Sequence, residues 1–137
     1  MRVFFDSSAF AKRYLDEQGT AEVIAWCEQA TELSLSVIAI PEIISAFCRL
    51  RRERRLSASQ YLRLKGELTA DIADALICDT TPQVIGHSIQ ALEHHTLRAM
   101  DAIHVGAALA SAADVFVSAD ARQCVAAKAH GLRVVAV

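Results

Sequence analysis

The sequence has little of what interrupts or crosslinks a chain: five glycines, two prolines and four cysteines among 137 residues. With so few glycines and prolines we find no flexible linker, and we expect one domain over residues 1–137. The cysteines (Cys27, Cys48, Cys78 and Cys124) form no Cys-x-x-Cys pair, so the spacing of a zinc site is absent. Their apolar neighbourhoods favour free, buried thiols in a reducing cytoplasm.

Long hydrophobic runs and a strong net charge are also missing. No apolar run has the length of a membrane span, and the run before Asp6 is too short for a signal peptide. We therefore expect a cytoplasmic protein that does not associate with a membrane. The net charge of −2 and the pI of about 6.2 argue against a general polyanion binder. A local basic patch or a bound cation could still serve nucleic acid. The hydrophobic content of 53% allows a sizeable core.

Short apolar runs alternate with helical patterns along the chain. Strands are expected at 3–5, 33–37, 76–78, 115–117 and 134–137. Helices are expected at 9–15, 21–29, 41–50, from 57 onward, 82–95, 102–113 and 121–130, with Ser7 or Ser8, Ser57 (in Ser57-x-x-Gln60) and Gly131 as capping residues. Because helices separate the strands, we predict an α/β fold with a mostly parallel sheet of four to five strands, covered on both faces.

Among the sixteen acidic residues we single out four that directly adjoin apolar residues: Asp6 follows Val3-Phe4-Phe5, and Glu42, Asp101 and Asp120 have apolar residues on both sides. Taken singly, each could be a turn residue, an N-cap or an acid near a helix dipole, an effect of about 0.3–1 kcal/mol. Taken together they are more informative. Two would follow strands and two would lie in first helical turns, so all four belong to the carboxyl edge of a parallel sheet, where such sheets bind ligands.

Carboxylates that meet in a partly apolar pocket repel one another and lose hydration. A hard divalent cation removes that penalty, and Mg²⁺ and Mn²⁺ prefer oxygen ligands. The residues therefore predict a Mg²⁺ or Mn²⁺ site formed by these four acids.

Four motifs, in this order and at this spacing, resemble the PIN-domain ribonucleases, most closely the VapC-type toxins of toxin–antitoxin pairs. They are Val-Phe-Phe-Asp6-Ser-Ser-Ala-Phe-Ala-Lys, Pro41-Glu42, Arg98-Ala-Met-Asp101-Ala-Ile-His and Phe-Val-Ser-Ala-Asp120. The resemblance implies a three-layer α/β/α PIN-like fold and Mg²⁺- or Mn²⁺-dependent hydrolysis of RNA. It also implies a cognate antitoxin protein as partner, and a homodimer.

By the same resemblance, Asp6, Glu42, Asp101 and Asp120 would be the catalytic, metal-binding quartet. Ser8 would support the metal or phosphate beside Asp6, and Ser118 matches the Ser/Thr of the last motif. Water, activated by one or two cations, would attack the phosphorus in line. The products would then carry a 5′-phosphate and a 3′-hydroxyl.

Other polar residues near these motifs have open roles. His104, three residues after Asp101, could be a general base or a histidine that supports the site. Arg98 could contact phosphate or pair with a carboxylate, and Lys12 could meet phosphate. The basic run Arg49–Arg55 could be a solvated helix end, an RNA-backbone contact or a surface for an acidic partner segment.

Two other functions compete with a ribonuclease. A phosphatase of the haloacid-dehalogenase type could use Asp6 as a nucleophile, but Asp6-Ser7-Ser8 lacks the second Asp of its Asp-x-Asp motif. A non-catalytic RNA- or protein-binding module would be expected to lose part of the acidic quartet. All four acids are present, which favours the nuclease.

Overall fold

Five strands form one fully parallel sheet in the computed structural model, which describes residues 1–137. The strands are β1 (Arg2–Phe5), β2 (Glu32–Ser36), β3 (Leu76–Cys78), β4 (Val115–Ser118) and β5 (Arg133–Ala136), in the order β3-β2-β1-β4-β5. All four pairings are parallel. This confirms the predicted parallel sheet and its strand count.

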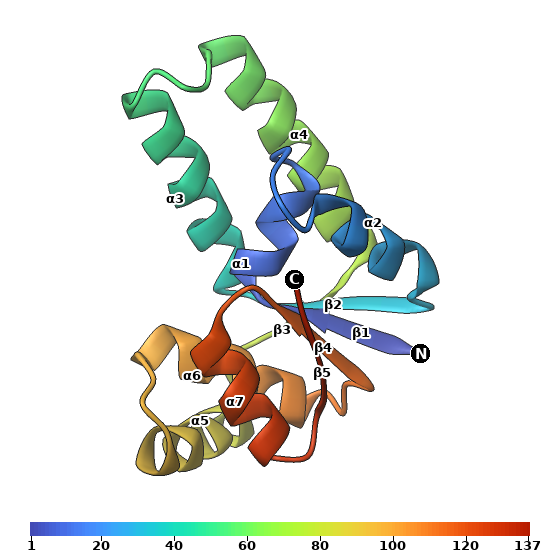
Figure 1. The fold of residues 1–137 in the computed structure, drawn as a ribbon, viewed down its shortest axis with the longest axis vertical. Helices are drawn as coiled ribbons and strands as arrows, with labels where there is room; N and C mark the ends of the chain where they lie inside the picture. Colours follow the sequence, from blue (N-terminus) through green and yellow to red (C-terminus); the bar gives the residue numbers. More distant parts are fainter.

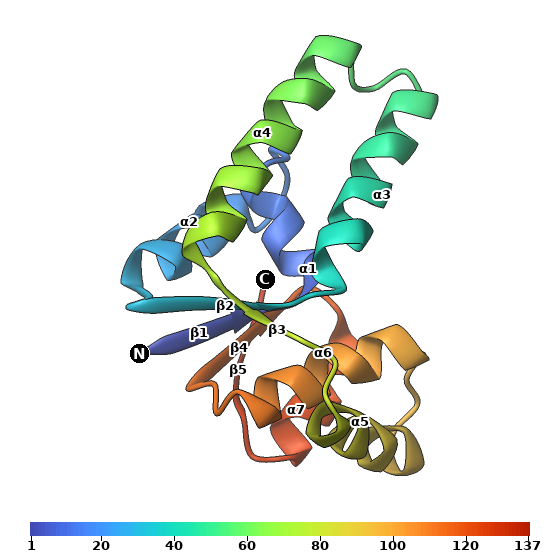
Figure 2. The same ribbon diagram turned by 180° about the vertical axis from the view of Figure 1, so that it is seen from behind.

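Helices cover both faces of the sheet, as Figures 1 and 2 show. One face carries α1 (Ser7–Phe10), the 3-10 turn η1 (Ala11–Arg13), α2 (Thr20–Gln29), α3 (Ala39–Arg52) and α4 (Ala58–Asp74). The other carries α5 (Pro82–His94), α6 (Ala99–Ala110) and α7 (Ala121–Ala129). The hairpin of α3 and α4 extends well beyond the sheet. The three-layer α/β/α arrangement is the predicted one.

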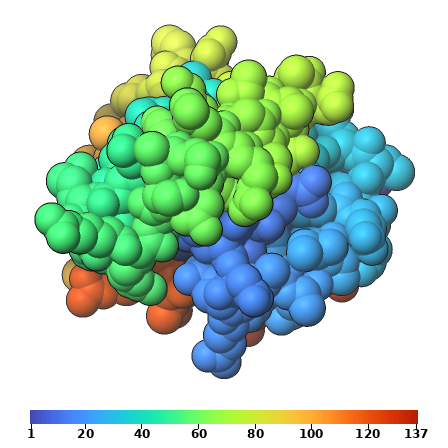
Figure 3. Space-filling model, turned by 90° about the horizontal axis from the view of Figure 1, so that it is seen from above, coloured from blue at the N-terminus to red at the C-terminus, as the bar shows by residue number.

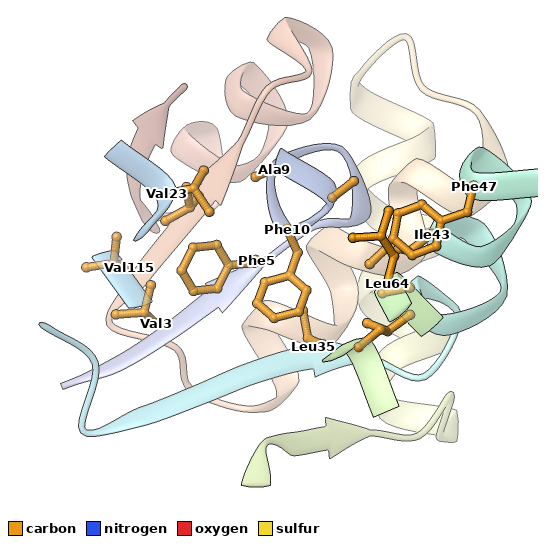
Figure 4. Close-up of a cluster of buried hydrophobic side chains, with 14 residues drawn as sticks. Val3, Phe5, Ala9, Phe10, Val23, Leu35, Ile43, Phe47, Leu64 and Val115 are labelled. Carbon is orange, nitrogen blue, oxygen red and sulfur yellow. The ribbon is translucent and has the colours of Figure 1, made fainter. Parts of the chain in front are cut away.

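Alternation along β1 divides the core between the two faces, because successive strand residues point to opposite sides. Val3 and Phe5 belong to a buried cluster with residues of α1 to α4, and Figure 4 shows Phe5 beside Phe10 within it. Phe4 belongs instead to the cluster of the α5–α7 face, where its ring stacks on Phe116 at 5.9 Å between centroids.

The capping signals of the later helices are confirmed. Ser57 and Gln60 form the reciprocal capping box of α4, and Gly131 has φ +94° after α7. The expected cap of the first helix is wrong: Asp6, not Ser7 or Ser8, is the N-cap of α1, accepting a hydrogen bond from the Ala9 amide. The α-helix ends after Phe10 and continues as η1.

The helix expected at 102–113 lies three residues earlier, at α6. Arg98 has extended backbone angles and its carbonyl accepts from the Ala102 amide, so Asp101 falls in the first turn. The end is set by Ala112, at φ +52°, and by bonds from the Ala112 and Ala113 amides to the carbonyls of Leu109 and Ala108. This is a Schellman ending without the usual glycine, so the sequence gives no signal for it.

The sheet has one topological switch point, between β1 and β4. From β1 the chain proceeds to β2 and β3 on one side, and it later crosses to β4 and β5 on the other. Open parallel sheets bind ligands beyond the carboxyl ends of the strands at such a point. None of the helices combines the length and apolarity needed to cross a membrane.

Candidate active site

Asp6 lies at the switch point, directly after β1, and its side chain is fully buried. As N-cap of α1 it accepts the Ala9 amide at 2.9 Å. Burial raises the pKa of Asp6, against the lowering effect of His104 and of hydrogen bonds from Ser8, Ala9 and Ser118. A carboxylate in this environment gains from a nearby cation, because a cation offsets the cost of lost hydration.

Two serines join Asp6 to the end of β4. The Ser8 hydroxyl lies 2.8 and 2.7 Å from the two Asp6 oxygens and accepts the Ala119 amide at 3.1 Å. The Ser118 hydroxyl donates to Asp6 Oδ2 at 2.7 Å and accepts the Asp120 amide at 2.9 Å. The parallel register, which pairs Phe5 with Val117, places Asp6 beside Ser118. Both serines thus fix the Asp6 carboxylate and the loop that carries Asp120.

Glu42 enters from the first turn of α3 and is half-buried. Its Oε1 accepts from the Ser7 hydroxyl at 3.0 Å and lies 2.5 Å from His104 Nε2. Partial burial acts to raise the pKa of Glu42, but the hydrogen bonds and charge of His104, with Ser7 and Arg98, outweigh it. The pKa of Glu42 therefore lies below its ordinary value, and the side chain is a carboxylate at neutral pH.

Asp101 lies in the first turn of α6 and is almost fully buried. Its two oxygens have separate partners: Gln123 Nε2 donates to Oδ1 at 3.1 Å, and Arg98 Nε donates to Oδ2 at 3.2 Å. The Arg98 side chain is 84% exposed, so its guanidinium stands at the surface while it restrains Asp101. Arg98 thus pairs with a carboxylate and remains accessible to an anion.

Asp120 is the N-cap of α7. Its Oδ1 accepts the amides of Arg122 and Gln123 at 2.8 and 3.2 Å. The cap explanation of Asp120 is therefore correct, and it does not exclude a second role, because Oδ2 has no protein partner.

One cavity of about 310 Å³ gathers Glu42, Asp101 and Asp120 on its wall, with Ser7, Ser8, Arg98 and Gln123. Asp6 does not line it but lies behind Ser8. A neighbouring hollow shares Ser8, Arg98, Asp101 and Asp120. The tertiary structure therefore brings three of the four acids to one space and keeps the fourth buried beneath it.

The acids stand apart in this structure, where no three Asp, Glu, His or Cys side chains are close enough to hold a metal ion. Each carboxylate instead has hydrogen-bond donors from the protein. The donor set is nonetheless suited to Mg²⁺ or Mn²⁺, because it consists of carboxylate and hydroxyl oxygens around one cavity above a buried, desolvated carboxylate.

Not every sequence candidate lies at the cavity. Lys12 turns away with η1, and its ammonium donates to the Gln18 carbonyl at 2.6 Å and lies 3.6 Å from Glu17. His104 is fully buried and does not line the cavity. Gln123 was missed by sequence reasoning. The signal that could have found it is an uncharged polar residue one turn after Asp120, among the buried alanines of α7.

The basic run Arg49–Arg55 begins at the site. Arg49 lines the cavity, and it also lines an adjacent groove of about 390 Å³ between the α3–α4 hairpin and the segment Tyr14–Glu17. Figure 3 shows this end of the molecule, where the green tip of the hairpin lies beside the blue segment after α1. Arg55 and Arg63 also line the groove. Basic residues thus continue from the acids along the hairpin.

Comparison with known proteins agrees with this geometry. The sequence model of the PIN domain matches residues 3–129. The chain belongs to the PIN-domain family. The ribonuclease VapC45 of Mycobacterium tuberculosis is 30% identical to it over 108 residues, which cover 79% of this chain and 75% of VapC45. This PIN-domain protein is therefore a relative of the VapC ribonucleases.

Solved structures share the fold. FitAcB from Neisseria gonorrhoeae superimposes with a TM-score of 0.72 at 16% identity, covering 96% of this chain and 95% of the other. VapC20 of Mycobacterium tuberculosis, described as a Sarcin-Ricin loop cleaving toxin, gives a TM-score of 0.69 at 14% identity, with 98% and 99% covered. At these identities the likeness concerns the fold.

Proposed function

We propose that residues 1–137 act as one PIN domain, a metal-dependent endoribonuclease and the toxin of a toxin–antitoxin pair. The observation that carries the proposal is the cavity at the switch point, where Glu42, Asp101 and Asp120 face one space above the buried Asp6. Membership of the family, and the relation to a VapC ribonuclease, support RNA as the substrate.

In this proposal Asp6, Glu42, Asp101 and Asp120 hold Mg²⁺ or Mn²⁺. When bound, the cation lowers the pKa of water and stabilises charge on the attacking and leaving oxygens of the phosphodiester. Ser8 and Ser118 keep the Asp6 carboxylate in place through their hydrogen bonds to both of its oxygens. Gln123 does the same for Asp101.

The exposed Arg98 and the groove residue Arg49 would receive the RNA backbone. Arg98 stands at the mouth of the cavity, so its guanidinium can contact a phosphate while Nε remains on Asp101. Arg49 joins the cavity to the groove along the hairpin. The net charge of −2 makes these local cations the means of attracting a polyanion. The partners we propose are an antitoxin protein and a second copy of the chain.

The proposal is tested by incubating the purified protein with RNA and Mg²⁺ or Mn²⁺ and sequencing the new ends. We expect 5′-phosphate and 3′-hydroxyl ends, no cleavage in excess EDTA and none with Asp101→Asn. Asp74→Asn is the matched control, because Asp74 is an exposed residue at the C-terminal end of α4 and does not line the cavity. Full cleavage by Asp101→Asn, or in EDTA, would contradict the proposal.

The biological part of the proposal requires cells. Expression of the chain alone should arrest growth and give one class of RNA new 5′-phosphate ends, whereas co-expression with its genomic neighbour should prevent both. Unchanged growth and RNA would refute the toxin role while leaving the nuclease chemistry to the assay in solution.

A further inference from the structure

His104 occupies a position where an imidazole is not needed for packing. It is fully buried on α6, and apart from Asp101 the other buried residues of that helix are alanine, glycine and valine. Its Nδ1 has no hydrogen-bond partner. A buried polar atom without a partner costs about 1–3 kcal/mol, so an aliphatic side chain of similar size would suit the packing better.

The other ring nitrogen makes the contact that explains the residue. Because an ionised carboxylate can only accept, Nε2 carries the proton and donates to Glu42 Oε1 at 2.5 Å. The Ser7 hydroxyl donates to the same oxygen at 3.0 Å and lies 3.4 Å from Nε2. Donors from α1 and α6 thus converge on one oxygen of a residue from α3.

This arrangement leaves the two oxygens of Glu42 in different situations. Oε1 is occupied by His104 and Ser7, and no protein hydrogen bond reaches Oε2. Glu42 is otherwise a partly exposed side chain with several rotatable bonds, whose carboxylate would sample many positions. Two donors on Oε1 restrict it and keep Oε2 as the oxygen that the cavity can use.

We propose that His104 is a positioning residue, which holds Glu42 through Oε1 so that Oε2 is presented to a divalent cation in the cavity. The inference rests on the proposed metal site. Partners of this kind, one step removed from the metal, typically change metal affinity or activity by about 10–100-fold when they are replaced.

The test compares Mn²⁺ affinity, measured by calorimetry, with the thermal stability of the metal-free protein. His104→Leu removes the donor together with the unpaired nitrogen. We expect Mn²⁺ affinity to fall by about 10–100-fold while the metal-free melting temperature is unchanged or rises. A histidine with only a structural role would instead lower the melting temperature and leave Mn²⁺ affinity alone, and that result would overturn the proposal.

A second pair of variants covers the case in which His104→Leu does not fold. His104→Gln places an amide nitrogen near the position of Nε2, whereas His104→Asn is too short to reach Glu42. We expect Gln to retain most of the Mn²⁺ affinity and Asn to lose it. Equal affinities of the two would overturn the proposal. His94→Gln is the control, because His94 is an exposed histidine on α5.

Failure of the metal site itself gives a different result. If Asp101→Asn binds Mn²⁺ as tightly as the wild type, the proposed site is wrong. If Asp101→Asn loses affinity and His104→Leu does not, only the role of His104 is wrong. In the double variant with Glu42→Gln, removing His104 should cause no further loss, because the carboxylate that it holds is already gone.

Discussion

At the scale of a single residue, Asp6 combines three structural and chemical roles. It is an N-cap, a buried acid with a raised pKa, and the acceptor for two serines from different elements. The capping role alone would be satisfied by serine or asparagine. Three donors, from Ser8, Ala9 and Ser118, surround this desolvated carboxylate, which is more than a cap requires, and they favour a negative charge beneath the cavity.

Replacing Asp6 tests this charge through stability as well as activity. Mn²⁺ at about one hundred times its dissociation constant should raise the free energy of unfolding of the wild type by about 2.7 kcal/mol. Asp6→Asn should show little of this gain in stability. Its RNA cleavage should fall by at least about 100-fold, which is the largest loss typical of residues that contact a metal ligand rather than the metal itself. Thermal and denaturant unfolding with and without Mn²⁺ measure it, with Asp74→Asn as control. An undiminished gain in Asp6→Asn would exclude Asp6 from the site.

At the scale of elements, the long hairpin of α3 and α4 is connected to the rest of the domain by a cluster of polar and aromatic contacts. Asp71 on α4 accepts Arg13 Nε at 2.8 Å and the Tyr14 hydroxyl at 2.6 Å. Tyr14 in turn packs edge-on against Phe47 of α3. Burial acts to raise the pKa of Asp71, but the hydrogen bonds from Arg13 and Tyr14 lower it below its ordinary value. These contacts join η1 and the adjoining Tyr14 to both helices of the hairpin.

Asp71→Ala should lower the free energy of unfolding by about 1–2 kcal/mol at pH 7, because hydrogen bonds to a partly exposed charged group are lost. The depressed pKa means that this contribution is fully present above the unfolded value of about 3.9 and is lost progressively as the pH falls from there through the lower pKa of the folded state. Urea unfolding at pH 7 and pH 3 measures both, with Asp74→Ala as control. A difference from wild type that is as large at pH 3 as at pH 7 would contradict the assignment.

At the scale of the whole molecule, the ends of α5 and α7 meet in a cluster of histidines. The ring of His130 lies 5.4 Å from that of His95 and 6.5 Å from that of His94, and its Nε2 is buried without a partner. Burial, with His95, His94 and His87, lowers the pKa of His130. No carboxylate contributes to this shift, so no negative charge offsets the effect of burial.

His130 should therefore contribute a loss of stability in mild acid. The unfolded chain takes up a proton near the ordinary histidine value of about 6.5, before folded His130 does, so the contribution of His130 to the free energy of unfolding falls as the pH decreases from 7 to 5. His130→Gln should reduce this slope, and Lys128→Gln, an exposed neighbour on α7, should not. Urea titrations at intervals of pH measure it. An unchanged slope in His130→Gln would show that another group controls the acid response.

The sequence by itself determined the elements and the residues that matter, because those features depend on local physics. The apolar runs gave all five strands, Ser57 and Gln60 marked the start of α4, and Gly131 the end of α7. Apolar neighbours in the sequence singled out the four acids, since a charged residue in such surroundings is costly. The cap of α1 and the ends of α6 were missed, because Asp6 competed with two serines and Ala112 adopts a conformation usually left to glycine.

Only the tertiary structure decided how these residues act on one another. Strand order, set by packing on both faces, puts Ser118 beside Asp6, 112 positions away in the sequence. It also pairs His104 with Glu42 across 62 positions and leaves Lys12 turned away from the cavity. No local pattern encodes such contacts, because they depend on where the remaining elements pack.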